Sequence, residues 1–220
     1  MPRIERGLFD GFIYHILNRG NGKQTVFHEK YDYQYFVNLL YEAKKNYRVK
    51  IFAYCLMPNH YHLVVCPEKG DDLSKMLQWV MTSHVRYFHK LRGTSGHVWQ
   101  GRYKSFIIKN DAHLLTVLRY VENNPVRARI VNSGKEWLWS SLHQRLENKS
   151  NLLDKSPIEI PDNWENFING IIPEAEITKL RNCIQRQSPF GDSLWQTEIC
   201  NRFGLVSTLN PRGRPRKGKK

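Results

Sequence analysis

The sequence predicts an α+β protein in which helices pack on an antiparallel sheet. Stretches rich in strand formers alternate with amphipathic stretches, in the order strand, helix, strand, strand, helix, strand, helix. The second and third strands are joined only by the turn at Met57 to Asn59, which indicates an antiparallel hairpin. This order of elements is typical of a ferredoxin-like sheet.

The first half of the chain supplies three strands and one helix. Gly11 to Asn18 is rich in strand formers and ends at a turn-forming Arg-Gly-Asn-Gly sequence. Apolar residues recur at helical spacing from Tyr31 to Lys45. Val49 to Leu56 predicts the second strand, and the third begins at His60.

The clearest helix spans Leu73 to Leu91, where seven apolar residues form one continuous stripe. Asp71 or Asp72 is its expected N-cap. His84 lies on or beside the stripe, so we expect a core or groove histidine there and not a metal ligand.

The segment His97 to Ile108 predicts an extended fourth strand that interleaves aromatic residues with Arg102 and Lys104. Such a composition suits the stacking of bases and the binding of phosphates. An ordinary edge strand with solvated basic residues explains the same pattern, and the sequence leaves both readings open.

Asp111 to Asn124 predicts the next helix, with Asp111 as N-cap and Pro125 ending it. Tyr120 and Asn124 are four residues apart and therefore share one helical face.

Beyond this helix the pattern of apolar residues is less regular. We expect a short helix around residues 137–142, a linker or extended excursion over 147–162, and helices over 174–186 and 193–202.

The composition limits the classes of function. With 220 residues and 40% hydrophobic content, a packed core is expected and global disorder is excluded. The chain shows no apolar run of membrane-spanning length, no secretory signal and no Cys-x-x-Cys pair, which suggests a reducing cytoplasm. A net charge of +14 indicates a polyanionic partner such as nucleic acid or a membrane surface.

His60 and His62 are the first candidates for chemistry. Side chains alternate along a strand, so both imidazoles point to one side, roughly 7 Å apart. Such a pair can hold one divalent metal ion, although His-x-His pairs are also common without a metal. A tyrosine near such a metal could attack a phosphodiester, and Tyr120 with Asn124 offers a nucleophile and an amide oxygen.

Several ordered motifs resemble the HUH single-tyrosine transposases of the IS200-like superfamily. They are Phe12 to Gly20, Met57 to His62, Val98 to Tyr103 and Arg119 to Ala128. The C-terminal motifs resemble the REP-associated tyrosine transposases in particular: Pro189 to Gly191, Trp195, Arg202 to Leu205, Ser207 to Leu209 and Pro211 to Lys217.

The resemblance implies an HUH endonuclease fold with His60, His62 and Asn124 as ligands of Mg²⁺ or Mn²⁺ and Tyr120 as the nucleophile. It implies nicking and rejoining of single-stranded DNA hairpins, REP-like palindromes with a 5′ guide sequence, through a 5′-phosphotyrosine. We expect DNA contacts from basic residues in these motifs and in the tail: Arg19, Arg102, Lys104, Arg127, Arg212, Arg214, Arg216 and Lys217.

Other residues that match the family pattern have structural explanations. His15 is expected to fill the sheet face, whereas Arg19 could either pair with an acid or contact DNA. The sheet tyrosines Tyr54, Tyr61 and Tyr103 are expected to pack, because none has an amide partner at helical spacing.

Three regions are predicted: a catalytic domain over residues 1–145, a partly helical extension over 146–210 and a basic tail over 211–220. The tail holds six Lys or Arg and no acid, leaving +8 on the first 210 residues. Its Gly-Arg-Pro core resembles an AT-hook that enters a narrow minor groove, and non-specific attraction to polyanions is the equal alternative. By resemblance we expect a monomer in the bacterial cytoplasm, associated with the nucleoid, with a dimer as the alternative.

Two rival functions remain open from the sequence. One is a non-catalytic, regulatory nucleic-acid-binding protein that keeps the fold. The other is a metal-dependent protein that processes RNA.

Overall fold

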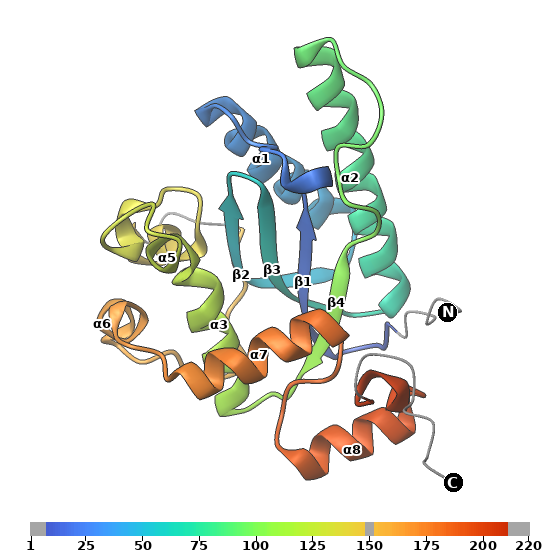
Figure 1. Ribbon diagram of the computed structural model, residues 1–220, viewed down its shortest axis with the longest axis vertical. Coiled ribbons are helices and arrows are strands. Elements are labelled where there is room, and N and C mark those ends of the chain that lie inside the picture. Colours follow the sequence, from blue (N-terminus) through green and yellow to red (C-terminus); the bar gives the residue numbers. More distant parts are fainter. Residues whose placement is uncertain (1–7, 148–151, 211–220) are drawn as a thin grey trace, which may run out of the picture.

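The structure is a computed structural model that describes residues 8–147 and 152–210. It confirms the α+β class: a four-stranded antiparallel sheet carries helices on both faces (Figure 1). The strand order is β2-β3-β1-β4, the order of a ferredoxin-like sheet. The strands are β1 (Ile13–Arg19), β2 (Val49–Met57), β3 (His60–Pro67) and β4 (Lys104–Ile108).

The β2–β3 hairpin is as tight as predicted, because only Pro58 and Asn59 separate the two strands. Met57 pairs with His60 directly across the turn. The carbonyl of Pro58 also accepts hydrogen bonds from the backbone N–H groups of Val26 and Phe27. The turn that precedes the histidine pair is therefore fixed by the chain that follows β1.

One face of the sheet is covered by α1 (Lys30–Asn46) and α2 (Gly70–Arg92). The predicted N-cap of α2 is wrong, because the cap is Lys69 and the helix already begins at Gly70. Gly70 donates its N–H to Asp10 and lies so close to the carbonyl of Leu8 that a side chain would collide with it. Asp71 and Asp72 instead occupy the first turn, where negatively charged carboxylates interact favourably with the positive end of the helix dipole.

β4 is shorter than predicted, since residues 97–103 are a loop and pairing with β1 begins at Lys104. Two features explain the difference. Gly101 has φ +70°, which interrupts an extended strand, and β1 ends at Arg19, so little partner strand remains. A single bridge between Gly20 and Trp99 keeps the loop against the sheet.

The opposite face is covered by α3 (Ala112–Glu122), whose N-cap is Asp111 as predicted. The helix ends two residues earlier than predicted, and after Asn123 the chain starts a short second helix, α4 (Asn124–Arg127). Pro125 is accepted in the first turn of α4, where a missing N–H leaves no helical hydrogen bond unmade.

Four further helices follow, and α7 and α8 have the predicted bounds. The region predicted as a linker contains no helix or strand between residues 152 and 163. It is nevertheless attached to the core, because Asp154 accepts a hydrogen bond from the backbone N–H of Ile51 and forms a salt bridge with Lys44 of α1. A helix from 164 to 169 was not predicted. The helices are α5 (Ser141–Glu147), α6 (Trp164–Asn169), α7 (Glu174–Arg186) and α8 (Ser193–Arg202).

Later segments join both edges of the sheet. Phe190 makes backbone hydrogen bonds with Ile107 and Lys109 beside β4. At the other edge, Leu56 of β2 donates its N–H to the carbonyl of Trp139, and Ser141 accepts from Tyr54. Three short 3-10 turns complete the described chain: Asn21–Lys23, Gly134–Glu136 and Val206–Thr208.

Within the described residues, no helix has the length and apolar character needed to cross a membrane. The basic tail predicted at 211–220, including Arg212, Arg214, Arg216 and Lys217, lies outside these residues.

Candidate active site

A pocket of about 460 Å³ opens where β1 and β3 meet the helices of the second face. It is lined by the four residues predicted to carry the chemistry: His60, His62, Tyr120 and Asn124. The histidines come from β3, Tyr120 from α3 and Asn124 from the first position of α4. The fold thus brings together residues that are up to 64 positions apart in the sequence.

The two histidines lie on the sheet face that α3 covers, as strand alternation predicts. Their ring centroids are 5.0 Å apart and the rings are nearly perpendicular. His62 is buried, and His60 is half-buried at the start of β3, directly after the Pro58-Asn59 turn. Burial lowers the pKa of both rings, that of His60 to about 4 with Arg19 adding repulsion, so both imidazoles are neutral near pH 7.

The His62 ring is held by His15, whose Nε2 lies 2.8 Å from His62 Nδ1. His15 is buried on β1 against Phe106, as the structural reading predicted, but its contact with His62 was not foreseen. Burial lowers the pKa of His15 to about 3, so this ring is also neutral near pH 7. One of the two facing nitrogens therefore donates its N–H and the other accepts with its lone pair. When His62 Nδ1 donates, Nε2 of His62 is left with a free lone pair.

The His60 ring is oriented by Asn59. The amide nitrogen of Asn59 donates to the carbonyl of Lys23 at 3.2 Å, which turns its oxygen toward His60. His60 Nδ1 lies 2.6 Å from that oxygen and therefore donates to it. In both histidines Nδ1 is engaged by a neighbour, and Nε2 is the nitrogen available as a ligand.

Tyr120 and Asn124 share a face despite the break between α3 and α4. The amide nitrogen of Asn124 donates to the carbonyl of Tyr120 at 2.8 Å and approaches that of Val121 at 3.4 Å. Pro125 has no N–H for the Val121 carbonyl, so the Asn124 side chain replaces part of that helical hydrogen bond. The bonds found among the described residues use only the amide nitrogen of Asn124, leaving its oxygen for the pocket.

A cation packs on the candidate nucleophile. The guanidinium carbon of Arg127 lies 4.4 Å from the centroid of the Tyr120 ring, and the His62 ring lies 5.9 Å from the same ring. Arg127 Nη1 is buried without a hydrogen-bond partner among the described residues. The Arg127 guanidinium therefore lies next to the phenol and has an N–H group that is not used in a hydrogen bond to the described residues.

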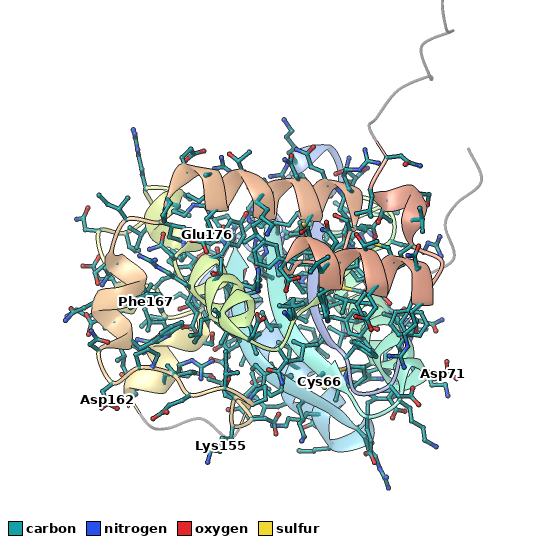
Figure 2. The ribbon with its side chains drawn as sticks, turned by 90° about the horizontal axis from the view of Figure 1, so that it is seen from below. Cys66, Asp71, Lys155, Asp162, Phe167 and Glu176 are labelled. Carbon is teal, nitrogen blue, oxygen red and sulfur yellow. The ribbon has the colours of Figure 1, made fainter. Side chains whose placement is uncertain are left out.

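Side chains from three later helices fix α3 and hence Tyr120. Glu122 is fully buried and accepts hydrogen bonds from Ser141, from Arg145 at 2.9 Å and from Trp164 at 2.7 Å. Arg119 stacks on Phe167 of α6, and Thr116 donates to Glu176 of α7 at 2.7 Å. Figure 2 shows Phe167 and Glu176 on the helices that flank α3.

The donor set fits a divalent cation that also takes oxygen ligands from a substrate. It consists of two neutral imidazole nitrogens and one amide oxygen, which add no negative charge and leave positions open. Among residues 8–147 and 152–210, no group of three or more His, Cys, Asp or Glu side chains offers an alternative metal site. With His60 and His62, the amide oxygen of Asn124 would make a third protein ligand for such a cation.

Three of the basic residues predicted to contact DNA line the same pocket: Arg19, Arg102 and Lys104. Sequence reasoning missed the polar residues Gln100, Arg181 and Gln185, which also line it. Arg181 and Gln185 come from α7, and no local motif marks them because only the tertiary fold brings that helix to the site. The tyrosines Tyr54, Tyr61 and Tyr103 belong to the core on the other face, as expected.

The sequence profile of the family described as "Transposase IS200 like" matches residues 9–124. A Haemophilus influenzae protein whose name identifies it as a REP-associated tyrosine transposase is 29% identical over 110 residues. The match covers 46% of this chain and 62% of that protein. The REP-associated tyrosine transposase of Escherichia coli is 25% identical over 134 residues, covering 60% and 75% of the two chains.

A solved structure of a REP-associated tyrosine transposase bound to a REP hairpin has a similar fold. The TM-score is 0.57 at 20% sequence identity, and the alignment covers 72% of this chain and 98% of the other. At this identity the likeness concerns the fold alone.

Proposed function

Because the chain belongs to the IS200-like transposase family, we propose that it nicks and rejoins single-stranded DNA hairpins through a covalent bond to Tyr120. The observation that carries the proposal is the single pocket in which Tyr120 lies with His60, His62 and Asn124 among basic side chains. The names of the relatives, and the REP hairpin bound to the structural neighbour, support a hairpin of REP type as substrate.

We propose that Nε2 of His60, Nε2 of His62 and the amide oxygen of Asn124 hold Mg²⁺ or Mn²⁺. The positions of Asn59 and His15 support this assignment, because they occupy the other ring nitrogens. A bound divalent cation would draw negative charge from an oxygen of the scissile phosphate.

In the proposed reaction the Tyr120 oxygen forms a bond to phosphorus while the bond from phosphorus to the 3′ oxygen breaks. The phenol loses its proton to solvent, and the departing 3′ oxygen gains one. The products are a 5′-phosphotyrosine and a free 3′-OH, which can attack in the reverse direction to rejoin a strand. The spare N–H of Arg127 supports a role in binding the phosphate beside Tyr120.

Arg19, Arg102 and Lys104 are proposed to bind the flanking phosphates, since they line the pocket and are positively charged. We propose that residues 1–145 form the catalytic domain and that the extension over 146–210 completes its site through Arg181 and Gln185. The tail over 211–220 would add affinity for DNA. The protein is proposed to act as a monomer in the bacterial cytoplasm, on nucleoid DNA.

A covalent-adduct assay tests the proposal. The probe is a hairpin oligonucleotide taken from palindromic repeats beside the gene and labelled on the 3′ side of the nick. Incubation with Mn²⁺ should give a shifted protein band on a denaturing gel. Tyr120→Phe should abolish that band, because phenylalanine has no oxygen to accept the phosphoryl group. Tyr31→Phe, an exposed change on α1, should leave the band unchanged.

Three outcomes would contradict the proposal. A band that persists in Tyr120→Phe would remove Tyr120 as nucleophile, and unchanged cleavage by His60→Ala would remove the metal assignment. Tight hairpin binding without any adduct in Mg²⁺ or Mn²⁺ would favour the non-catalytic, regulatory reading. Cleavage of an RNA hairpin in preference to the DNA hairpin would favour RNA processing.

A further inference from the structure

A second and larger pocket, of about 840 Å³, lies on the other face of the sheet. One wall is α2 and the other is the loop of residues 96–103, which leads into β4. Its walls are mainly apolar and aromatic: Leu77, Met81, Val85, Val98, Trp99 and Tyr103. Figure 1 shows this loop running beside α2 before it enters β4.

The two pockets meet at the end of β1. Asn18 and Arg102 line both of them. The amide nitrogen of Asn18 donates to the carbonyl of Gly101 at 3.3 Å, which holds the loop at this edge. A polymer with one unit in the catalytic pocket can therefore place an adjacent unit in the second pocket by passing over Arg102.

The chemistry of the lining matches a nucleotide. Among the described residues that line the pocket none is a carboxylate, and the charged side chains are Arg86 and Arg102. Trp99 is buried in the wall, and its indole N–H has no acceptor among the described residues. Aromatic and aliphatic walls accept the face of an unstacked base, whereas guanidinium groups at the rim bind its phosphate.

We propose that this pocket binds one unstacked nucleobase from the DNA strand whose phosphate occupies the catalytic pocket. The inference rests on the proposed function and extends it, since it assigns a flanking base to a defined site on the far side of the sheet edge. Arg102 lies between the two units and binds the phosphate that joins them.

An abasic scan tests this directly. Hairpin oligonucleotides carry one abasic site at each position flanking the scissile phosphate in turn, and binding is measured by fluorescence anisotropy in EDTA, which prevents cleavage. One position should stand out with about tenfold weaker binding, the loss of one stacked base. A flat scan would overturn the proposal.

Variants then locate that base. Thr82 lies on the exposed side of the pocket, so Thr82→Trp should fill it, whereas Thr82→Ala should not. Thr82→Trp should bind intact DNA about tenfold more weakly and lose nothing further on the sensitive abasic substrate. Losses that multiply on that substrate would place the base elsewhere and overturn the proposal.

A second pair of variants separates the pocket from general charge. Arg86→Ala should weaken binding of intact DNA more than Lys90→Ala, which removes the same charge from an exposed position of α2 outside the pocket. Equal losses would contradict the assignment. If Thr82→Trp instead changes the sedimentation of the free protein while the scan is flat, the pocket serves a protein partner.

These measurements distinguish the inference from the proposed function. The scan reports on binding alone, so the expected pattern can appear even when the wild-type protein forms no covalent adduct. Conversely, an adduct at Tyr120 combined with a flat scan would leave the proposed function intact and remove the base pocket.

Discussion

Asn59 orients the ring of His60, a proposed metal ligand. Its amide bridges the Lys23 carbonyl and His60 Nδ1, so the His60 ring is presented with Nε2 outward. Neighbours of this kind commonly change metal affinity by 10- to 100-fold. The order of residues in Asn59-His60 gave no indication of this contact, because it depends on the turn around Lys23.

We predict that Asn59→Ala weakens Mn²⁺ binding by about tenfold, because the His60 ring loses its orienting acceptor. Isothermal titration of the DNA-free protein with MnCl₂ measures the effect without reference to activity. Asn38→Ala, an exposed amide on α1, is the matched control. Equal affinities for the two variants would show that Asn59 does not orient the ligand.

His84 is fully buried among aromatic rings, as the sequence predicted for a core histidine. Its ring centroid lies 5.3 Å from Phe27 and 5.2 Å from Trp99, and neither ring nitrogen has a partner among the described residues. Burial lowers its pKa to about 3, while the nearby Asp32 raises it and Arg92 lowers it. The neutral ring is therefore kept at a cost to stability.

His84→Phe should raise the free energy of unfolding by about 1 kcal/mol at pH 7, because two unpartnered buried nitrogens are removed. Below pH 6.5 the unfolded chain binds a proton that folded His84 accepts only near pH 3. The free energy of unfolding of the wild type should thus fall as the pH drops through this window. In the variant this dependence on pH should be weaker by the contribution of one proton. Urea unfolding between pH 4 and 7 measures both effects, with exposed His28→Phe as control.

At the scale of elements, α3 matters most because it carries the candidate nucleophile. Its buried Glu122 joins α5 and α6 through Ser141, Arg145 and Trp164. Arg145 also donates to the carbonyl of Phe52 in β2. A buried carboxylate with several donors is expensive to disrupt, since each donor then loses its acceptor charge.

Glu122→Gln should lower the free energy of unfolding by about 3 kcal/mol, because Arg145 loses its buried counter-charge while the side-chain shape is kept. Chemical denaturation with far-UV circular dichroism gives the value. The exposed change Glu42→Gln on α1 should shift stability by only a few tenths of a kcal/mol. A similar small shift for Glu122→Gln would show that the carboxylate charge is not needed to hold α3.

Local sequence signals were sufficient for most elements but not for their tertiary adjustments. Apolar periodicity predicted α7 and α8 with their observed bounds, and Asp111 was identified as a cap from its position alone. The α2 cap and the start of β4 were wrong, because Leu8 and the length of β1 decide them. Alternation and helical spacing predicted that His60 shares a face with His62 and that Tyr120 shares one with Asn124, and the family resemblance implied that the two pairs form one site. The contact of His15 with His62 and the place of Arg181 in the pocket depend on long-range packing.

At the scale of the whole molecule, positive charge is found both in the first 210 residues and in the C-terminal tail. The tail over 211–220 contributes six of the positive charges, and the first 210 residues keep +8. Cations that neutralise DNA phosphates release counterions, so the salt dependence of binding reports how many of them engage.

Deletion of residues 211–220 should weaken hairpin binding and reduce the slope of log affinity against log salt by up to about four, if all six cations contact single-stranded phosphates. Anisotropy titrations between 50 and 200 mM salt, about the range in which such slopes are resolved, provide the measurement. An uncharged Gly-Ser tail of equal length separates charge from length. An unchanged slope would exclude a DNA-binding role for the tail.

The backbone bonds at Phe190 and Trp139 have a consequence for how the protein reaches its native state. β4 and β2 are the outer strands, and open outer strands are templates for intermolecular association. In the folded chain these strands are covered by segments that are synthesised long after them. Until residues 139–190 have emerged from the ribosome, a partly folded chain therefore exposes two strands to aggregation, and the finished protein does not.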